Sequence, residues 1–76
     1  MQLKTYFYKA KLPPVGASFD MPAFDVAGDD MSLDTAISVA RRTADREQVN
    51  AFTVEASGRE VARWIKVNGE WRSDHV

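Results

Sequence analysis

The segment FDVAGDDMSLDTAISVARRTADRE, from Phe24 to Glu47, decides the fold of this chain. Its pattern predicts the end of a strand, a short acidic turn and then one amphipathic helix. The segments on both sides of it have the aromatic and β-branched residues that are typical of strands. A single helix among strands must cover the apolar face of a sheet, because neither element can bury its hydrophobic side alone.

The predicted helix begins after Ser32, whose hydroxyl can accept a hydrogen bond from a backbone N–H of the first turn. A stripe of apolar residues at helical spacing should face the sheet, and alanine at three of its five positions favours a close approach. The stripe consists of Leu33, Ala36, Ile37, Ala40 and Ala44, and Val39 and Thr43 widen it. We expect the helix to end between Gln48 and Asn50, with Asn50 in the left-handed conformation that closes many helices.

Two extended segments precede the helix. The first is expected from Gln2 to Lys11, with the Leu3/Phe7 face buried and with Tyr6 and Tyr8 on the open face of the sheet. The prolines of Leu12–Gly16 should stop this strand. The second segment is expected from about Ser18 to Ala27, with a possible loop at its beginning, and Gly28-Asp29-Asp30 should turn the chain into the helix. We expect Phe24 and Val26 to alternate inward.

An antiparallel meander is expected after the helix. Its strands are Ala51–Ala56, Val61–Val67 and Glu70–Ser73, joined by hairpin turns at Ser57–Glu60 and at Asn68-Gly69, the second a strong type I′ signal. A two-residue turn pairs Lys66 with Trp71. One face then carries Trp64, Lys66 and Trp71, and the other carries Val61, Ile65 and Val67.

The predicted fold class is therefore α+β. One amphipathic helix packs on one face of a small antiparallel sheet with the order β-β-α-β-β-β, and residues 1–76 form a single domain.

The composition limits the classes of function. Ten basic and eleven acidic residues give a formal net charge of −1, which argues against a generic basic nucleic-acid binder and against a strongly acidic DNA mimic. No apolar stretch approaches the roughly 20 residues of a membrane span, and the lysines near the N-terminus do not fit a signal peptide. We expect a protein of the cytoplasm, and the absence of cysteine agrees with a reducing compartment.

Catalytic chemistry is not expected. The chain has one histidine, His75, in a tail that we expect to be frayed, and neither Ser32 nor Ser57 has a base beside it in sequence. Asp25, Asp29, Asp30 and Asp34 form an acidic cluster, but a helix start attracts acids and the spacing matches no EF-hand. We therefore expect no enzyme, no metal and no cofactor.

Two sets of residues are candidates for binding a partner. The first is a basic ridge on the exposed helix face, which suits an acidic protein surface or phosphate. Aromatic and basic residues of the strands form the second set, which could be a protein-binding hot spot, a base-stacking platform on the open face or, for the tryptophans, part of the core. The ridge consists of Arg41, Arg42 and Arg46, and the second set of Tyr6, Tyr8, Arg63, Trp64, Lys66 and Trp71.

The layout of the helix and the final hairpin resembles small phage-encoded anti-CRISPR proteins. The matching stretches are FDVAGDDMSLDTAISVARRTADREQ, AFTVEAS and ARWIKVNGEWRSD, which cover about the last two-thirds of the chain. The likeness is greatest to an inhibitor of the type I-F surveillance complex and rests on Ser32, Leu33, Ala36, Glu47, Gln48, Gly69 and Trp71. It implies a non-enzymatic inhibitor that occupies a protein subunit of a CRISPR–Cas effector complex in the bacterial host and blocks target DNA.

Two alternatives remain. SFDMPAFDVAGDDMSLDTAISVA resembles a segment of antitoxins in the double-stranded-RNA-binding-like toxin–antitoxin family, although the Pro-Gly element of that family is missing after Pro22. The other alternative is direct binding of RNA or single-stranded DNA by the sheet face. The sequence leaves the oligomeric state open.

Overall fold

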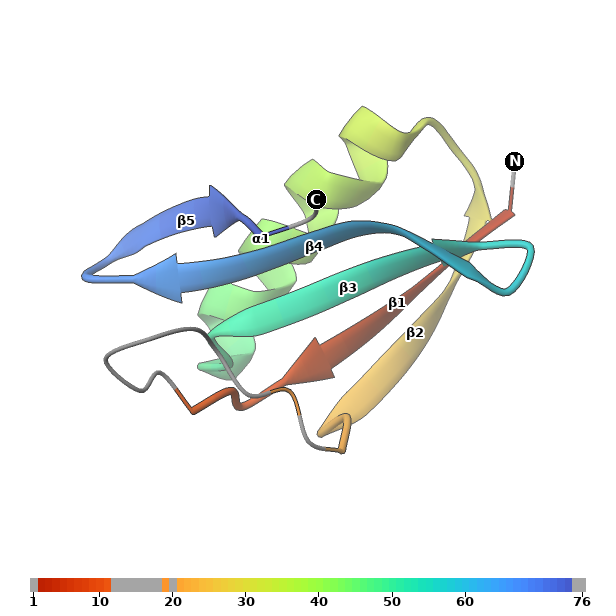
Figure 1. Ribbon diagram of the computed structural model, residues 1–76. Coiled ribbons are helices and arrows are strands. Elements are labelled where there is room, and N and C mark those ends of the chain that lie inside the picture. Colours follow the sequence, from red (N-terminus) through yellow and green to blue (C-terminus); the bar gives the residue numbers. More distant parts are fainter. Residues whose placement is uncertain (1, 12–18, 20, 75–76) are drawn as a thin grey trace.

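The computed structural model describes residues 2–11, 19 and 21–74, and of Ala27 and Asp29 only the backbone. The predictions for the break at Leu12–Gly16 and for the tail with His75 lie outside these residues. The described chain forms one five-stranded antiparallel sheet with one helix across one face, which confirms the α+β class (Figure 1). The elements are β1 (Gln2–Tyr8), β2 (Phe24–Asp30), α1 (Leu33–Glu47), β3 (Ala51–Ala56), β4 (Arg59–Val67) and β5 (Glu70–Ser73). None of the described helical residues form a helix long and apolar enough to cross a membrane.

The strand order in the sheet is β2-β1-β3-β4-β5, and every pair is antiparallel. A row of aromatic rings crosses the helix-covered face of this sheet, because Phe24 pairs with Phe7, Phe7 with Phe52, and Phe52 with Trp64. The rings of Phe7 and Phe24 stack with centroids 4.6 Å apart, and Phe52 lies 6.1 Å from Phe7 and 6.5 Å from Trp64. Cross-strand aromatic pairs of this kind fix the register of the strands.

The helix packs on this aromatic row through its alanines. Ala36, Ala40 and Ala44 are buried, whereas Leu33 and Ile37 are half-buried against the same core. Small side chains on the contact face allow the helix to approach the sheet closely. The helix lies over β1 and β3, so the outer strand β2 is not covered by it (Figure 1).

Both ends of the helix are closed by specific hydrogen bonds. Ser32 is the N-cap, as predicted, and its hydroxyl accepts from the backbone N–H of Thr35 at 3.2 Å. At the C-terminal end the prediction for Asn50 is wrong, because Gln48 takes the left-handed conformation with φ of 59°. The N–H of Val49 then bonds to the carbonyl of Ala44 at 3.0 Å, the pattern of a Schellman motif.

Asn50 has a different task. Its side-chain amide accepts from the backbone N–H of Ala10 at 2.7 Å and donates to the carbonyl of Ala10 at 2.8 Å. The side chain thus pairs with the backbone just beyond β1 as a neighbouring strand would, and it joins the end of β1 to the start of β3.

Two strands differ from the prediction because each contains a β-bulge. β2 continues through Gly28, Asp29 and Asp30, which the sequence had suggested as a turn, and its register against β1 shifts by one residue there. In β4 the extra residue is Val61, which lies between the partners of Val54 and Glu55. Val61 therefore packs against the core instead of sharing a face with Ile65. The other strand assignments agree within a few residues, and both hairpins have the positive φ angles of type I′ turns, at Ser57-Gly58 and at Asn68-Gly69.

Candidate functional site

The nine residues singled out for binding fall on three surfaces. Four of them meet beside the C-terminal half of α1, on the helix-covered side of β4 and β5. Two lie on the solvent side of α1, and three lie on the sheet face away from the helix. The three groups are Arg41, Trp64, Lys66 and Trp71; Arg42 and Arg46; and Tyr6, Tyr8 and Arg63. The tryptophans and tyrosines therefore do not form one platform on the open face.

The first group and the neighbouring Asp45 form a set that we call the tryptophan cluster: Arg41, Asp45, Trp64, Lys66 and Trp71. The guanidinium carbon of Arg41 lies 5.2 Å from the ring centroid of Trp64, and the Nζ of Lys66 lies 5.8 Å from that of Trp71. Both distances fit cation–π contacts. Both indoles are only half-buried, so the cluster presents aromatic surface next to positive charge.

Asp45 holds two side chains of the cluster, Lys66 and Trp71, in place. Its Oδ1 accepts from the Nζ of Lys66 at 2.7 Å and from the indole Nε1 of Trp71 at 3.3 Å. The hydrogen bond from Lys66 is the main reason that the pKa of Asp45 lies below its usual value, and the contact with Trp71 adds to this effect. The inner side of the cluster is fixed by packing, since the Trp71 ring centroid lies 5.3 Å from that of the fully buried Phe52.

The predicted arginine ridge is divided by this arrangement. Arg41 is half-buried and points to Trp64, whereas Arg42 and Arg46 are exposed. Arg46 also contacts its neighbour Glu47, with 3.4 Å between Nε and Oε2. The ridge is therefore not a uniform surface of three free cations.

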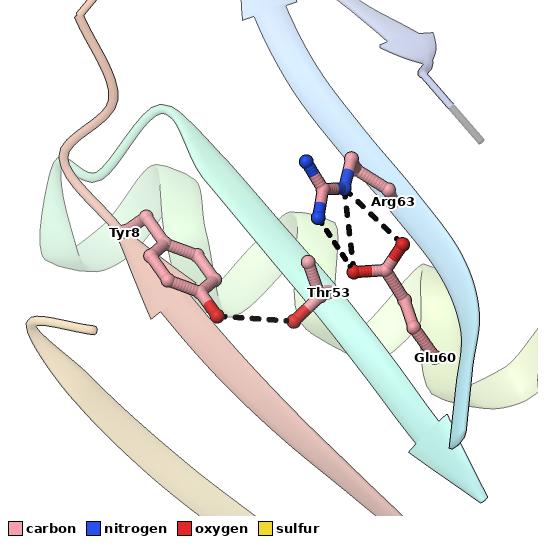
Figure 2. Close-up of polar contacts among 4 residues, drawn as sticks. All are labelled: Tyr8, Thr53, Glu60 and Arg63. Carbon is pink, nitrogen blue, oxygen red and sulfur yellow. Dashed lines mark hydrogen bonds and ion pairs between the residues drawn. The ribbon is translucent and has the colours of Figure 1, made fainter. Parts of the chain in front are cut away.

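The sheet face away from the helix carries two polar contacts made by residues of three neighbouring strands (Figure 2). The hydroxyls of Tyr8 on β1 and Thr53 on β3 lie 3.4 Å apart, and Arg63 on β4 forms a two-nitrogen ion pair with Glu60. The bulge in β4 puts Glu60 and Arg63 on the same face, although they are three residues apart. The hydrogen bond from Glu60 raises the pKa of Arg63.

Phe19 covers part of this face. Its ring centroid lies 5.0 Å from that of Tyr8 and 4.6 Å from the guanidinium carbon of Arg63. Thr53 beneath these side chains is only 2% exposed. No sequence pattern indicates this contact, because Phe19 is distant in sequence from Arg63 and lies outside any periodic pattern.

The cations of the open face have carboxylate partners. Lys4 lies 3.3 Å from Asp25, and its contacts with Tyr6 and then with Asp25 raise the pKa of its ammonium group. Arg63 is paired with Glu60, and Arg72 lies 3.6 Å from Glu70. This pairing reduces the positive potential that a phosphate backbone requires.

A groove that the sequence did not indicate runs between α1 and β2, and we call it the α1–β2 groove. It encloses about 60 Å³ and is lined almost entirely by apolar atoms. Val26 and Val39 on its two sides are 45% and 41% exposed, although both had been expected to face the core. Strand alternation for Val26 and helical spacing for Val39 identified the correct faces. Both residues are nevertheless exposed, because the helix does not reach across β2. The walls of the groove include Leu3, Thr5, Val26, Met31, Val39 and Thr43.

Within residues 2–11, 19 and 21–74, no group of three or more histidine, aspartate or glutamate side chains is placed to hold a metal ion. Comparison with known proteins gave no match: no family model fits the sequence, and no curated protein and no solved structure was found to be similar to it.

Proposed function

We propose that this chain acts by binding a protein partner through the tryptophan cluster. The observation that supports the proposal is that two half-buried indoles each lie against a cation beside α1, Trp64 against Arg41 and Trp71 against Lys66. The carboxylate of Asp45 bonds to the second of these pairs. Tryptophan and arginine are the residues that contribute most often to binding hot spots. Because hydrogen bonds and packing already hold these side chains, little conformational entropy would be lost on binding.

The partner surface should be acidic at its rim. The cluster carries two cations and one anion, and the exposed Arg42 and Arg46 follow on the same half of α1. A carboxylate of the partner would meet the arginines, while apolar partner side chains would cover the indoles.

We further propose, on the resemblance described above, that the partner is a protein subunit of a type I-F CRISPR effector complex and that binding prevents access to target DNA. The direct nucleic-acid alternative has less support, because the cations of the open sheet face are paired with carboxylates. The antitoxin alternative predicts a small toxin gene next to the gene for this chain.

The test is binding to purified type I-F surveillance complex, together with plasmid interference in cells. We expect the unaltered chain to bind and to restore plasmid transfer, and we expect Arg41→Glu to weaken binding. Arg72→Glu is the matched control, because it makes the same change of charge on the opposite face of the sheet. Loss of binding in Arg72→Glu but not in Arg41→Glu would contradict the proposed surface, and intact interference would contradict the proposed target.

The nucleic-acid alternative can be tested without knowing the protein partner. Oligonucleotide binding should be absent, or should show no steep dependence on salt. Affinity for single-stranded DNA or RNA that falls by orders of magnitude with salt and is lost in Tyr6→Ala would favour the nucleic-acid function instead.

A further inference from the structure

The α1–β2 groove lies beside an unpaired strand edge. β2 is the outermost strand of the sheet, and in the described part of the chain only β1 pairs with it. A free strand edge offers a row of backbone N–H and C=O groups to another extended chain. Addition of a strand at such an edge is a common way for a domain to bind a peptide.

The side chains of an added strand would alternate between the two faces of the sheet. Those on the helix side would point towards Val26 and Val39 and into the groove, whose apolar space of about 60 Å³ is several times what one water requires. One small aliphatic side chain, such as valine, would fit there. Those on the other side would lie near Asp25, whose side chain is paired with Lys4 but still 49% exposed.

The charge of this edge favours a basic occupant. β2 contains three aspartates and no basic residue, and the first turn of α1 adds the exposed Asp34. Lys4 on β1 pairs with one of the three, Asp25, so the edge stays acidic overall. A second copy of the chain fits this edge poorly, because its own β2 strand is equally acidic. Like charges brought together across a strand pair destabilise it.

We propose that β2 and the α1–β2 groove bind an extended basic peptide segment as a sixth strand, with aliphatic side chains in the groove and lysine or arginine on the opposite face. This site is separate from the tryptophan cluster, which lies on the other flank of the helix. Binding at β2 can therefore be tested independently of binding at the tryptophan cluster.

The probe is a heptapeptide of alternating lysine and valine with blocked ends, titrated into the isotope-labelled full chain and followed by the amide NMR signals. We expect the shifts to change at β2 and along Val39 and Thr43. A glutamate–valine peptide should not bind, because its charge is reversed. The lysine–valine peptide with alternate amides methylated should not bind either, because it has lost the donors for strand pairing.

A pair of variants locates the peptide in the groove. Val39→Lys should weaken binding about tenfold, because it places a cation where an aliphatic side chain docks. Ser38→Lys is the control, since it adds the same charge at the neighbouring exposed position of α1. Thermal melting would show that both variants fold, and lysine is a good helix former.

Several outcomes would overturn the proposal. Equal binding of the methylated peptide would mean that no strand is added, and equal binding of the glutamate peptide would remove the charge argument. Equal effects of Ser38→Lys and Val39→Lys on binding would mean that charge repulsion alone weakens it and that no side chain docks in the groove. Dimerisation of the free chain in sedimentation, with β2 signals that depend on protein concentration, would assign the edge to a second copy. Absence of any shift change at β2 would refute the site altogether.

Discussion

Asp45 on α1 accepts a hydrogen bond of 2.7 Å from the Nζ of Lys66 on β4, so one carboxylate joins the last turn of the helix to the C-terminal hairpin. Both side chains are partly exposed, and solvent screening keeps the contribution of such a pair below about 1 kcal/mol. Its importance is geometric, because the same oxygen also orients the indole of Trp71.

This contact predicts a specific dependence of stability on pH. The pKa of Asp45 is lowered in the folded chain, so its stabilising effect is present above the pKa of the unfolded state and is lost as the pH falls through the folded-state pKa. The stability difference between the unaltered chain and Asp45→Asn should therefore be present near pH 7 and shrink below about pH 4. Urea unfolding at several pH values measures it. A difference that stays constant down to the acid limit would contradict the prediction.

The pair of hydrogen bonds between Asn50 and the backbone of Ala10 should be important for stability. Asn50→Ala leaves a partly buried N–H and C=O without this partner, and we expect a loss of about 1–3 kcal/mol in the free energy of unfolding. Asn50→Asp keeps the acceptor for the Ala10 N–H but sets a carboxylate oxygen against the Ala10 carbonyl, so it should also be less stable than the unaltered chain. Equal stability of Asn50→Ala and the unaltered chain would show that water replaces the amide without cost.

The left-handed conformation of Gln48 predicts a stabilising substitution. Glycine adopts a φ of 59° without steric cost, and Gln48→Gly should raise the free energy of unfolding by about 0.5–1 kcal/mol. Glu47→Gly is the control, because this residue is still helical and glycine there should cost about 1 kcal/mol. The opposite signs at adjacent positions are the test, and chemical denaturation measures both.

Two glycines should respond differently to alanine. A Cβ on Gly28 would lie 2.7 Å from the carbonyl oxygen of Leu3, and this backbone atom cannot move without disturbing the β1–β2 pairing. We expect Gly28→Ala to cost about 1–3 kcal/mol through overpacking. Gly58→Ala meets no atom within 4 Å and is disfavoured only by its φ of 78°, so its cost should stay near 1 kcal/mol. Amide exchange should show faster opening of β2 in Gly28→Ala alone.

The local features of the fold could be predicted because they depend on neighbours in sequence. The hydroxyl of Ser32 caps the helix, and Asn68-Gly69 forms the type I′ turn that pairs Lys66 with Trp71. The two-residue spacing of that turn correctly placed Trp64, Lys66 and Trp71 on one face. The alternation in β1 correctly put Leu3 and Phe7 in the core and Tyr6 and Tyr8 on the other face.

The features that were missed depend on distant contacts. A bulge inserts one residue without changing the composition of a strand, so the orientation of Val61 could not be deduced from alternation. An amphipathic pattern shows which side of a helix faces the sheet, but not which strands the helix covers. For this reason the exposure of Val26 and Val39 was not foreseen. The contact of Phe19 with Arg63 likewise joins segments that share no pattern.

The position of β1 between β2 and β3 has a consequence for synthesis of the chain. The β3–β4–β5 meander and the β1–β2 pair each join successive strands, whereas the β1–β3 pair joins residues from opposite halves of the chain. Long-range pairing of this kind must offset a larger loop-closure entropy before it stabilises the fold, and it is therefore slow. On the ribosome, Phe7 emerges before Phe52 but meets it only after the helix and β3 have left the exit tunnel. The central contact of the aromatic row therefore has to wait for a strand that is made well after β1.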